Sequence, residues 1–358
     1  MTQFCTVTPS GTATGMIADL DVVWLRGTGV EVGVIGHGAR IVAVRAPDRH
    51  GRWADIALGL PDAAAYRADR DYLGACVGRY ANRISGGSFV LDGVRHRVRC
   101  NEPDVALHGG PDAFEHADWE IDARPADPGP ATVTLRHTSP DGENGFPGTV
   151  EAAVTYRVSG SELAIAHEAS TDAPTVLNMT NHTYWNLAGA DLSGGGVVDH
   201  LFALAASAFL PVDGRLIPAG PPAQVAGTPF DLRTPTPIGA RLRGTHPQLL
   251  IAHGYDHNFV PDGDPGPDGL RHAALVTDPA GGRTLELRTD QPGMQFYTGN
   301  MLNGSLVLRG GVTARQTDAF CLEPQGFPDA PNRPDFPSTA LHPGQTYRSR
   351  AVFRFGTI

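Results

Sequence analysis

The chain has 358 residues and a formal net charge of −10, and all 28 of its basic residues are arginine. The acidic balance disfavours nucleic acid as a partner, and the absence of lysine excludes a lysine Schiff base and a P-loop. The 44 Gly and 30 Pro residues are typical of a protein with many turns and few long helices.

Four cysteines are scattered along the chain without Cys-x-x-Cys spacing: Cys5, Cys76, Cys100 and Cys321. This pattern supports neither a disulfide scaffold nor a cysteine-based metal site. The N-terminus lacks the basic and apolar segments of a signal peptide, and no apolar run is long enough to span a bilayer. We therefore expect a cytoplasmic protein with no membrane partner.

The first strand signals are short and lie between glycines. Residues 27–33 resemble a dinucleotide-binding fingerprint, but the last glycine comes one position too late. We interpret this segment as a turn that leads into a strand. Residues 88–91 and 94–98 flank Asp92-Gly93, a pair that favours a type I′ turn and predicts a β-hairpin.

Longer strands are predicted in the second half of the chain. Residues 149–158 alternate apolar and polar side chains, and residues 162–170 follow a short turn as a second strand. The Ala-rich residues 201–208 precede several Pro and Gly residues, so we interpret them as a strand that enters a loop. Residues 275–287 predict another hairpin, and residues 346–355 alternate again. Since only short loops separate these strands, we expect one all-β domain over residues 1–358.

Residues 178–187 carry the densest cluster of polar side chains, with three Asn, two Thr, one His, one Tyr and one Trp. A strand that only builds a core needs no such cluster. The segment offers hydrogen-bond donors and acceptors, aromatic faces and, in His182, a group that can transfer a proton near neutral pH. It suits a polar, ring-shaped ligand such as a sugar. The simpler alternative is an edge strand with a partly exposed histidine.

Five other segments contain residues able to take part in chemistry. Four of the candidate residues also have a structural interpretation: a surface ion pair for Arg83, a turn for His108, an Asx turn for Asp256, and a strand end for Glu323 before Pro324. The segments cover residues 78–84, 101–110, 255–259, 295–300 and 322–325.

Taken together, these segments resemble the aldose 1-epimerase (galactose mutarotase) family. The resemblance extends from about Gly33 to the C-terminus, and residues 1–30 look like a poorly matched N-terminal extension. His37 stands where the family usually has an aromatic residue. The resemblance is carried by residues 40–41, 47–55, 74–87, 101–110, 178–187 and 323–328.

The resemblance implies a large, mostly antiparallel β-sandwich with a sugar site on the concave face of one sheet. It implies Glu323 as general base and His182 as general acid. It also implies that sugar hydroxyls are held by Asn82, Arg83, His108, Asp256 and Gln295. The expected reaction interconverts the α and β anomers of a neutral aldose such as galactose or glucose, with no metal or other cofactor, in a monomer or homodimer.

Three alternatives remain open from the sequence. A glycoside hydrolase would use Asp256 and Glu323 as a carboxylate pair. A sugar-binding module would use the same residues without turnover. An epimerase-like enzyme acting on another hemiacetal in a tailoring pathway would share every residue named here.

Overall fold

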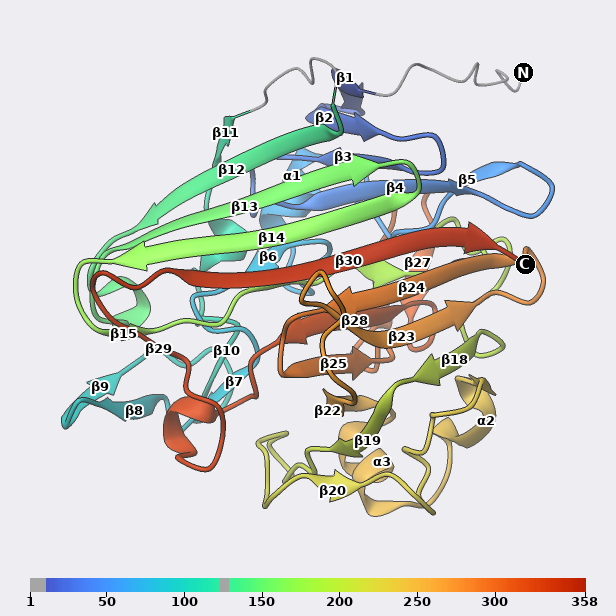
Figure 1. The fold of residues 1–358 in the computed structure, drawn as a ribbon. Helices are drawn as coiled ribbons and strands as arrows, with labels where there is room; N and C mark the ends of the chain where they lie inside the picture. Colours follow the sequence, from blue (N-terminus) through green and yellow to red (C-terminus); the bar gives the residue numbers. More distant parts are fainter. Residues whose placement is uncertain (1–10, 123–128) are drawn as a thin grey trace.

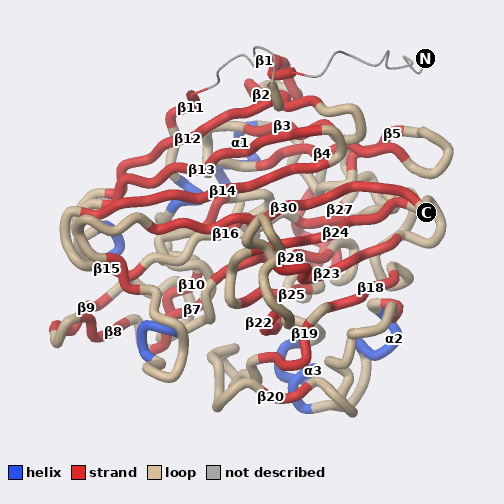
Figure 2. Tube along the Cα trace, in the orientation of Figure 1, coloured by secondary structure: helices blue, strands red, loops and turns tan. Residues whose placement is uncertain are grey.

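The computed structural model describes residues 11–122 and 129–358, and most of its regular structure is β-strand. In this part of the chain the helical segments are short, as Figure 2 shows. They are α1 (Ala63–Ala68), α2 (Gly239–Leu242), α3 (Pro247–Ala252) and the 3-10 turns η1 (Phe114–His116), η2 (Glu143–Gly145) and η3 (Ala330–Asn332). None of the described helices is long and apolar enough to cross a membrane.

The largest sheet has nine strands, and four of its long strands run side by side across the molecule (Figure 1). Its order is β11 (Glu120–Asp122), β12 (Ala131–Ser139), β13 (Val150–Ser159), β14 (Glu162–Thr171), β30 (Tyr347–Thr357), β24 (Arg283–Thr289), β23 (Arg271–Thr277), β18 (Leu201–Leu204) and β21 (Thr236–Pro237).

Two smaller sheets pack on this one. The five-stranded sheet contains β1 (Gly11–Ile17), β2 (Leu20–Arg26), β3 (Glu31–Val34), β4 (Ile41–Pro47) and β5 (Trp53–Asp55). The six-stranded sheet has the order β17 (Tyr184–Trp185), β28 (Phe320–Gln325), β25 (Gly293–Tyr297), β22 (Asp256–Pro261), β19 (Ala206–Phe209) and β20 (Ala223–Gln224).

Five two-stranded ribbons complete the described strands. They pair β6 (Cys76–Val77) with β16 (Thr180–Asn181), β7 (Arg83–Ser85) with β10 (Val105–Leu107), β8 (Ser88–Leu91) with β9 (Val94–Arg97), β15 (Thr175–Val176) with β29 (Ala340–Leu341), and β26 (Asn303–Val307) with β27 (Thr313–Arg315).

One hydrophobic cluster joins the three large sheets. It takes Val133 and Leu135 from β12, Val32 and Val34 from β3, and the aromatic side chains of β28 and β30. The rings of Trp185 on β17 and Phe353 on β30 lie 5.4 Å apart, so the six-stranded sheet packs directly on the nine-stranded one. The predicted all-β, antiparallel sandwich is confirmed. The shared core also supports our proposal of a single domain.

Most strand predictions agree with the structure. In β13 the alternate apolar residues are buried, as the pattern predicts. Asp92 and Gly93 both have positive φ (50° and 80°), as a type I′ turn requires. Residues 201–208 form two strands, β18 and β19, that belong to different sheets. The N-terminal segment that matched the family poorly forms β1 and β2 from residue 11 onward, and residues 1–10 lie outside the described chain.

Candidate active site

Three neighbouring strands of the six-stranded sheet carry the site's carboxyl and amide groups. Along β28, Phe320 and Leu322 enter the core, so Glu323 between Leu322 and Pro324 faces the opposite side. Gln295 on β25 is in register with Glu323, and its Nε2 donates a 2.6 Å hydrogen bond to Oδ1 of Asp256 on β22. Strand alternation therefore places Asp256, Gln295 and Glu323 on one face.

His182 lies between β16 and β17 and faces this row. The backbone of His182 is held by two hydrogen bonds to residues 74–75. Its N–H donates to the Ala75 carbonyl, and its carbonyl accepts from the Gly74 N–H. The imidazole Nε2 is 3.7 Å from Glu323 Oε1, and Nδ1 lies 3.6 Å from the Cys321 thiol. The predicted acid and base are thus neighbours across a buried space.

His108 and Asn82 hold each other through two hydrogen bonds. The His108 N–H donates to the Asn82 carbonyl, and the Asn82 N–H donates to His108 Nδ1 at 3.1 Å. Both residues have left-handed backbones, with φ of 51° and 65°. Gly109 follows His108, and only glycine fits there, because a Cβ at this position would lie 2.2 Å from the Gly78 carbonyl oxygen.

Arg83 follows Asn82 and is also nearly buried. Its Nε and Nη2 donate to the two carboxylate oxygens of Glu102 at 2.9 and 3.0 Å. Burial opposes the charged form, but the nearby Asp256 carboxylate and the bonds to Glu102 raise the pKa of Arg83. Arg79, four residues earlier, points elsewhere and donates to Ser139 and to several loop carbonyls.

A cavity of about 600 Å³ opens over these residues. Its walls include six of the seven predicted site residues: Asn82, Arg83, His108, His182, Asp256 and Glu323. The seventh, Gln295, is not in the wall and supports Asp256 from the sheet. The structure therefore brings all seven predicted residues together.

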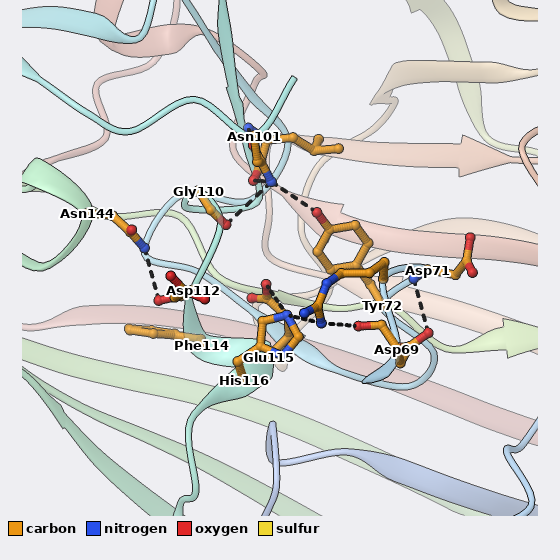
Figure 3. Close-up of polar contacts among 12 residues, drawn as sticks. Asp69, Asp71, Tyr72, Asn101, Gly110, Asp112, Phe114, Glu115, His116 and Asn144 are labelled. Atoms are coloured by element: carbon orange, nitrogen blue, oxygen red, sulfur yellow. Dashed lines mark hydrogen bonds and ion pairs between the residues drawn. The ribbon is translucent and has the colours of Figure 1, made fainter. Parts of the chain in front are cut away.

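The cavity wall also contains Tyr72 and Glu115, which the sequence did not single out. Figure 3 shows Tyr72 bonded through its hydroxyl to the amide of Asn101, at 3.2 Å, and Glu115 beside His116. Glu102 also lines the cavity. These residues come from loops and a 3-10 turn, where no periodic pattern marks them. His37, the departure from the family pattern, bonds Asp118 and is not in the cavity wall.

Burial changes the protonation of the site. It lowers the pKa of His182 to about 4 and lowers the pKa of His108 well below its usual value, where the neighbouring His182 and Arg83 add to the effect. It raises the pKa of Glu323 well above its usual range, with a further contribution from Asp256. Burial therefore favours the uncharged form of each of the two catalytic groups.

His108, His182 and Glu323 also form a cluster whose donor atoms lie within 4.8 Å of one another. Sequence spacing gave no sign of it, because the three residues are far apart in the chain. The tautomer of His108 argues against a metal ion: its Nδ1 accepts from the Asn82 N–H, so a neutral ring carries its hydrogen on Nε2. That nitrogen is then a donor toward the cavity and not a ligand.

The comparisons with known proteins agree with this geometry. The sequence model of the family described as Aldose 1-epimerase matches residues 21–354. The chain belongs to the aldose 1-epimerase family. The galactose mutarotases of Rattus norvegicus and Homo sapiens are each 40% identical to it, covering 92% and 91% of both chains. The aldose 1-epimerase of Escherichia coli is 33% identical over 91% of this chain and 92% of its own.

Solved structures of the aldose 1-epimerase family share the fold over the full length. A galactose 1-epimerase from Lactobacillus acidophilus superposes with a TM-score of 0.83 at 26% identity, covering 98% of this chain and 99% of its own. An aldose epimerase homologue from C. elegans gives 0.81 at 27% identity, covering 97% and 100%. The resemblance drawn from the site segments is confirmed as a family assignment.

Proposed function

We propose that this protein is an aldose 1-epimerase, an isomerase that interconverts the α and β anomers of a neutral aldose such as galactose or glucose. The observation that carries the proposal is the approach of His182 Nε2 to Glu323 Oε1, 3.7 Å apart in a buried cavity lined by sugar-binding side-chain types. Opening a pyranose needs one group that accepts a proton and one that donates a proton close together. This pair meets that need.

Glu323 accepts the proton of the C1 hydroxyl while His182 donates a proton to the ring oxygen O5. The C1–O5 bond breaks, C1 becomes an aldehyde carbon, and the pair has gained one proton and lost one. Rotation about C1–C2 turns the other face of the aldehyde toward the O5 hydroxyl. The two residues then reverse roles: His182 takes the O5 proton as O5 attacks C1, and Glu323 returns a proton to O1.

The pair needs one transferable proton throughout this cycle. Burial holds that proton on Glu323, because it raises the pKa of Glu323 and lowers that of His182. The sugar brings hydroxyl groups that solvate charge, which stabilises the form with the proton on His182. Glu323 Oε2 has no hydrogen-bond partner within the described chain, so one carboxyl oxygen is free for the C1 hydroxyl.

The other five residues hold the sugar in this scheme. His108 offers Nε2–H as a donor, and Arg83 adds a cationic donor. Asp256 accepts from hydroxyl groups while Gln295 fixes its orientation through their 2.6 Å bond. The Asn82 backbone positions His108, and its side chain lines the cavity. These donors and acceptors recognise a polyhydroxylated ring.

The alternatives fit the site less well. A hydrolase would use Asp256 as its second carboxyl group, but Asp256 is bonded to Gln295 and faces Arg83. A binding module needs no buried acid and base with such displaced pKa values. An enzyme for another hemiacetal would use the same proton transfers, and only its substrate would differ.

We propose that the enzyme uses no cofactor and works in the cytoplasm as a monomer or homodimer. The three cysteines in the described chain are free thiols, and Cys321 contacts His182 as a thiol. A reducing compartment preserves that contact.

Polarimetry on freshly dissolved α-galactose tests the function, beside a reducing-end assay on an oligosaccharide. The protein should speed the approach to anomeric equilibrium and release no new reducing ends. New reducing ends would identify a hydrolase, and binding without a change in rotation rate would identify a non-catalytic module.

A further inference from the structure

Glu102 holds one edge of the only arginine that the family resemblance places in the site. The Nε and Nη2 of Arg83 donate in parallel to the two oxygens of Glu102, at 2.9 and 3.0 Å. The Arg83 side chain is 9% exposed and that of Glu102 is 33% exposed. A planar guanidinium binds carboxylate and phosphate groups through such paired bonds, so Glu102 occupies an edge that an anionic ligand would otherwise use.

The rest of the guanidinium faces carboxyl groups and the cavity. Within the described chain, Nη1 donates to no protein acceptor, and Arg83 lines the cavity. Asp256 interacts with Arg83 through its charge. An anion that entered here would meet a cation whose charge Glu102 already compensates, and Arg70, the other arginine on the cavity wall, is bonded to the Asp69 carbonyl and to His116. A neutral hydroxyl needs only one donor and no uncompensated positive charge.

We infer that Glu102 is a specificity-determining residue: by holding the Nε–Nη2 edge of Arg83, it makes the cavity select neutral sugars over anionic ones. The inference rests on the proposed function and deepens it, because it explains which aldoses are accepted. Glu102 acts through Arg83 and is a positioning residue. A purely structural ion pair would affect folding but would not change the selection between neutral and anionic ligands.

The test compares Glu102→Gln with Asp104→Asn. The first change removes the charge that compensates Arg83 and keeps the side-chain shape. The second removes one charge from the same loop, where the Asp104 carboxylate is exposed and pairs with Arg215 at 3.3 Å. Asn tolerates the positive φ of Asp104 (56°). The probe is inorganic sulfate, small enough to reach Arg83, with ionic strength held constant by sodium chloride.

Inhibition of galactose mutarotation by sulfate is measured for the parent and both variants, and sulfate binding is measured by calorimetry. Glu102→Gln should lower the sulfate inhibition constant by about tenfold or more, with kcat for galactose within a few-fold and a higher KM. Asp104→Asn should match the parent. An unchanged constant in Glu102→Gln, or an equal fall in Asp104→Asn, would overturn the inference.

Calorimetry separates this inference from the proposed function. If the parent fails to speed mutarotation, the proposed function is wrong whatever sulfate does. Sulfate binding to Glu102→Gln, and to Glu102→Ala if the first variant folds poorly, still decides the role of Glu102. Equal sulfate affinity in the parent and the well-folded variant contradicts that role.

Discussion

Two sheets of the sandwich carry rows of polar side chains in opposite surroundings. On the outer face of the nine-stranded sheet, Glu168 and Arg348 pair at 3.0 Å across neighbouring strands, with 60% and 66% of their side chains exposed. On the inner row of the six-stranded sheet, Asp256 is 9% exposed and Glu323 2%. Oε2 of Glu323 and Oε1 of Gln295 have no hydrogen-bond partner in the part of the chain that the structure describes.

The two rows differ in exposure and in hydrogen bonding: the outer polar groups are solvated and paired, and the inner ones are buried with unpaired atoms that a ligand can bind. An exposed ion pair contributes roughly 0–1 kcal/mol to stability and is screened by salt. A buried polar group without a partner costs about 1–3 kcal/mol. The inner row therefore destabilises the free protein, and a polyhydroxylated ligand that satisfies these groups recovers that free energy. Substitutions in the inner row should therefore change catalysis and binding, and substitutions in the outer row should change little.

The largest effect is expected at His182. His182→Asn keeps a polar group of similar reach but cannot donate a proton to O5, so kcat should fall by roughly 10²–10⁴. Polarimetry on freshly dissolved α-galactose measures kcat, and near-ultraviolet circular dichroism checks the fold. A kcat within threefold of the parent would remove His182 from the proton-transfer step.

The pH dependence should be a broad plateau. The working pair holds one proton. Because the pKa of His182 is lowered to about 4, a second proton binds only in acid near that pH. Because the pKa of Glu323 is raised, the working proton leaves only well above the usual range of a carboxyl group. The profile of kcat/KM against pH should fall at both ends, with apparent values that belong to the pair. A kcat/KM that falls as the pH is lowered from 7 to 6 would contradict the lowered pKa of His182.

The same substitution at His108 should act on binding. His108→Asn removes the Nε2–H donor, and Asn tolerates the positive φ of this position (51°). The KM for galactose should rise by about tenfold, the loss of roughly one good hydrogen bond, while kcat changes only a few-fold. If both histidine variants lose kcat equally at unchanged KM, the two act as one unit.

The smallest effect is expected on the outer row. Glu168→Gln breaks an exposed ion pair with Arg348, so the free energy of unfolding should change by less than about 1 kcal/mol. Urea unfolding measures the stability, and polarimetry should give the kcat of the parent. A tenfold loss of activity would mean that the outer face is linked to the site.

Strands with one solvent-exposed face could be predicted from the sequence more clearly than strands that are buried on both faces. Residues 150–158 alternate because one face of β13 meets the core and the other meets solvent, so their pattern was clear from the sequence. Every residue of β28 is buried, so its polar residues interrupt an apolar run and give no clean period. The two ends of residues 201–208 enter different sheets, a division that tertiary packing decides and local pattern does not.

Site residues that lie in recognisable motifs could be predicted from the sequence. Residues that join the site only through proximity in the folded chain could not. The family resemblance pointed to the seven residues that the structure brings together around one cavity. Glu102 was not predicted, since it lies in a loop and matters through its bonds to Arg83 on another strand. The direction of the His182 and Glu323 pKa shifts could not be predicted from the sequence, because it depends on how completely the fold removes water.

The rate and affinity of Glu323→Gln test the central claim that Glu323 is the base in a buried proton-transfer pair. Gln keeps the shape of Glu323 and some of its hydrogen bonds but cannot accept the C1 proton. Mutarotation of galactose should slow by roughly 10²–10⁴, while the galactose Kd from calorimetry stays within about tenfold of the parent value. A variant that keeps more than a tenth of the parent kcat would contradict the assignment of Glu323 as the base.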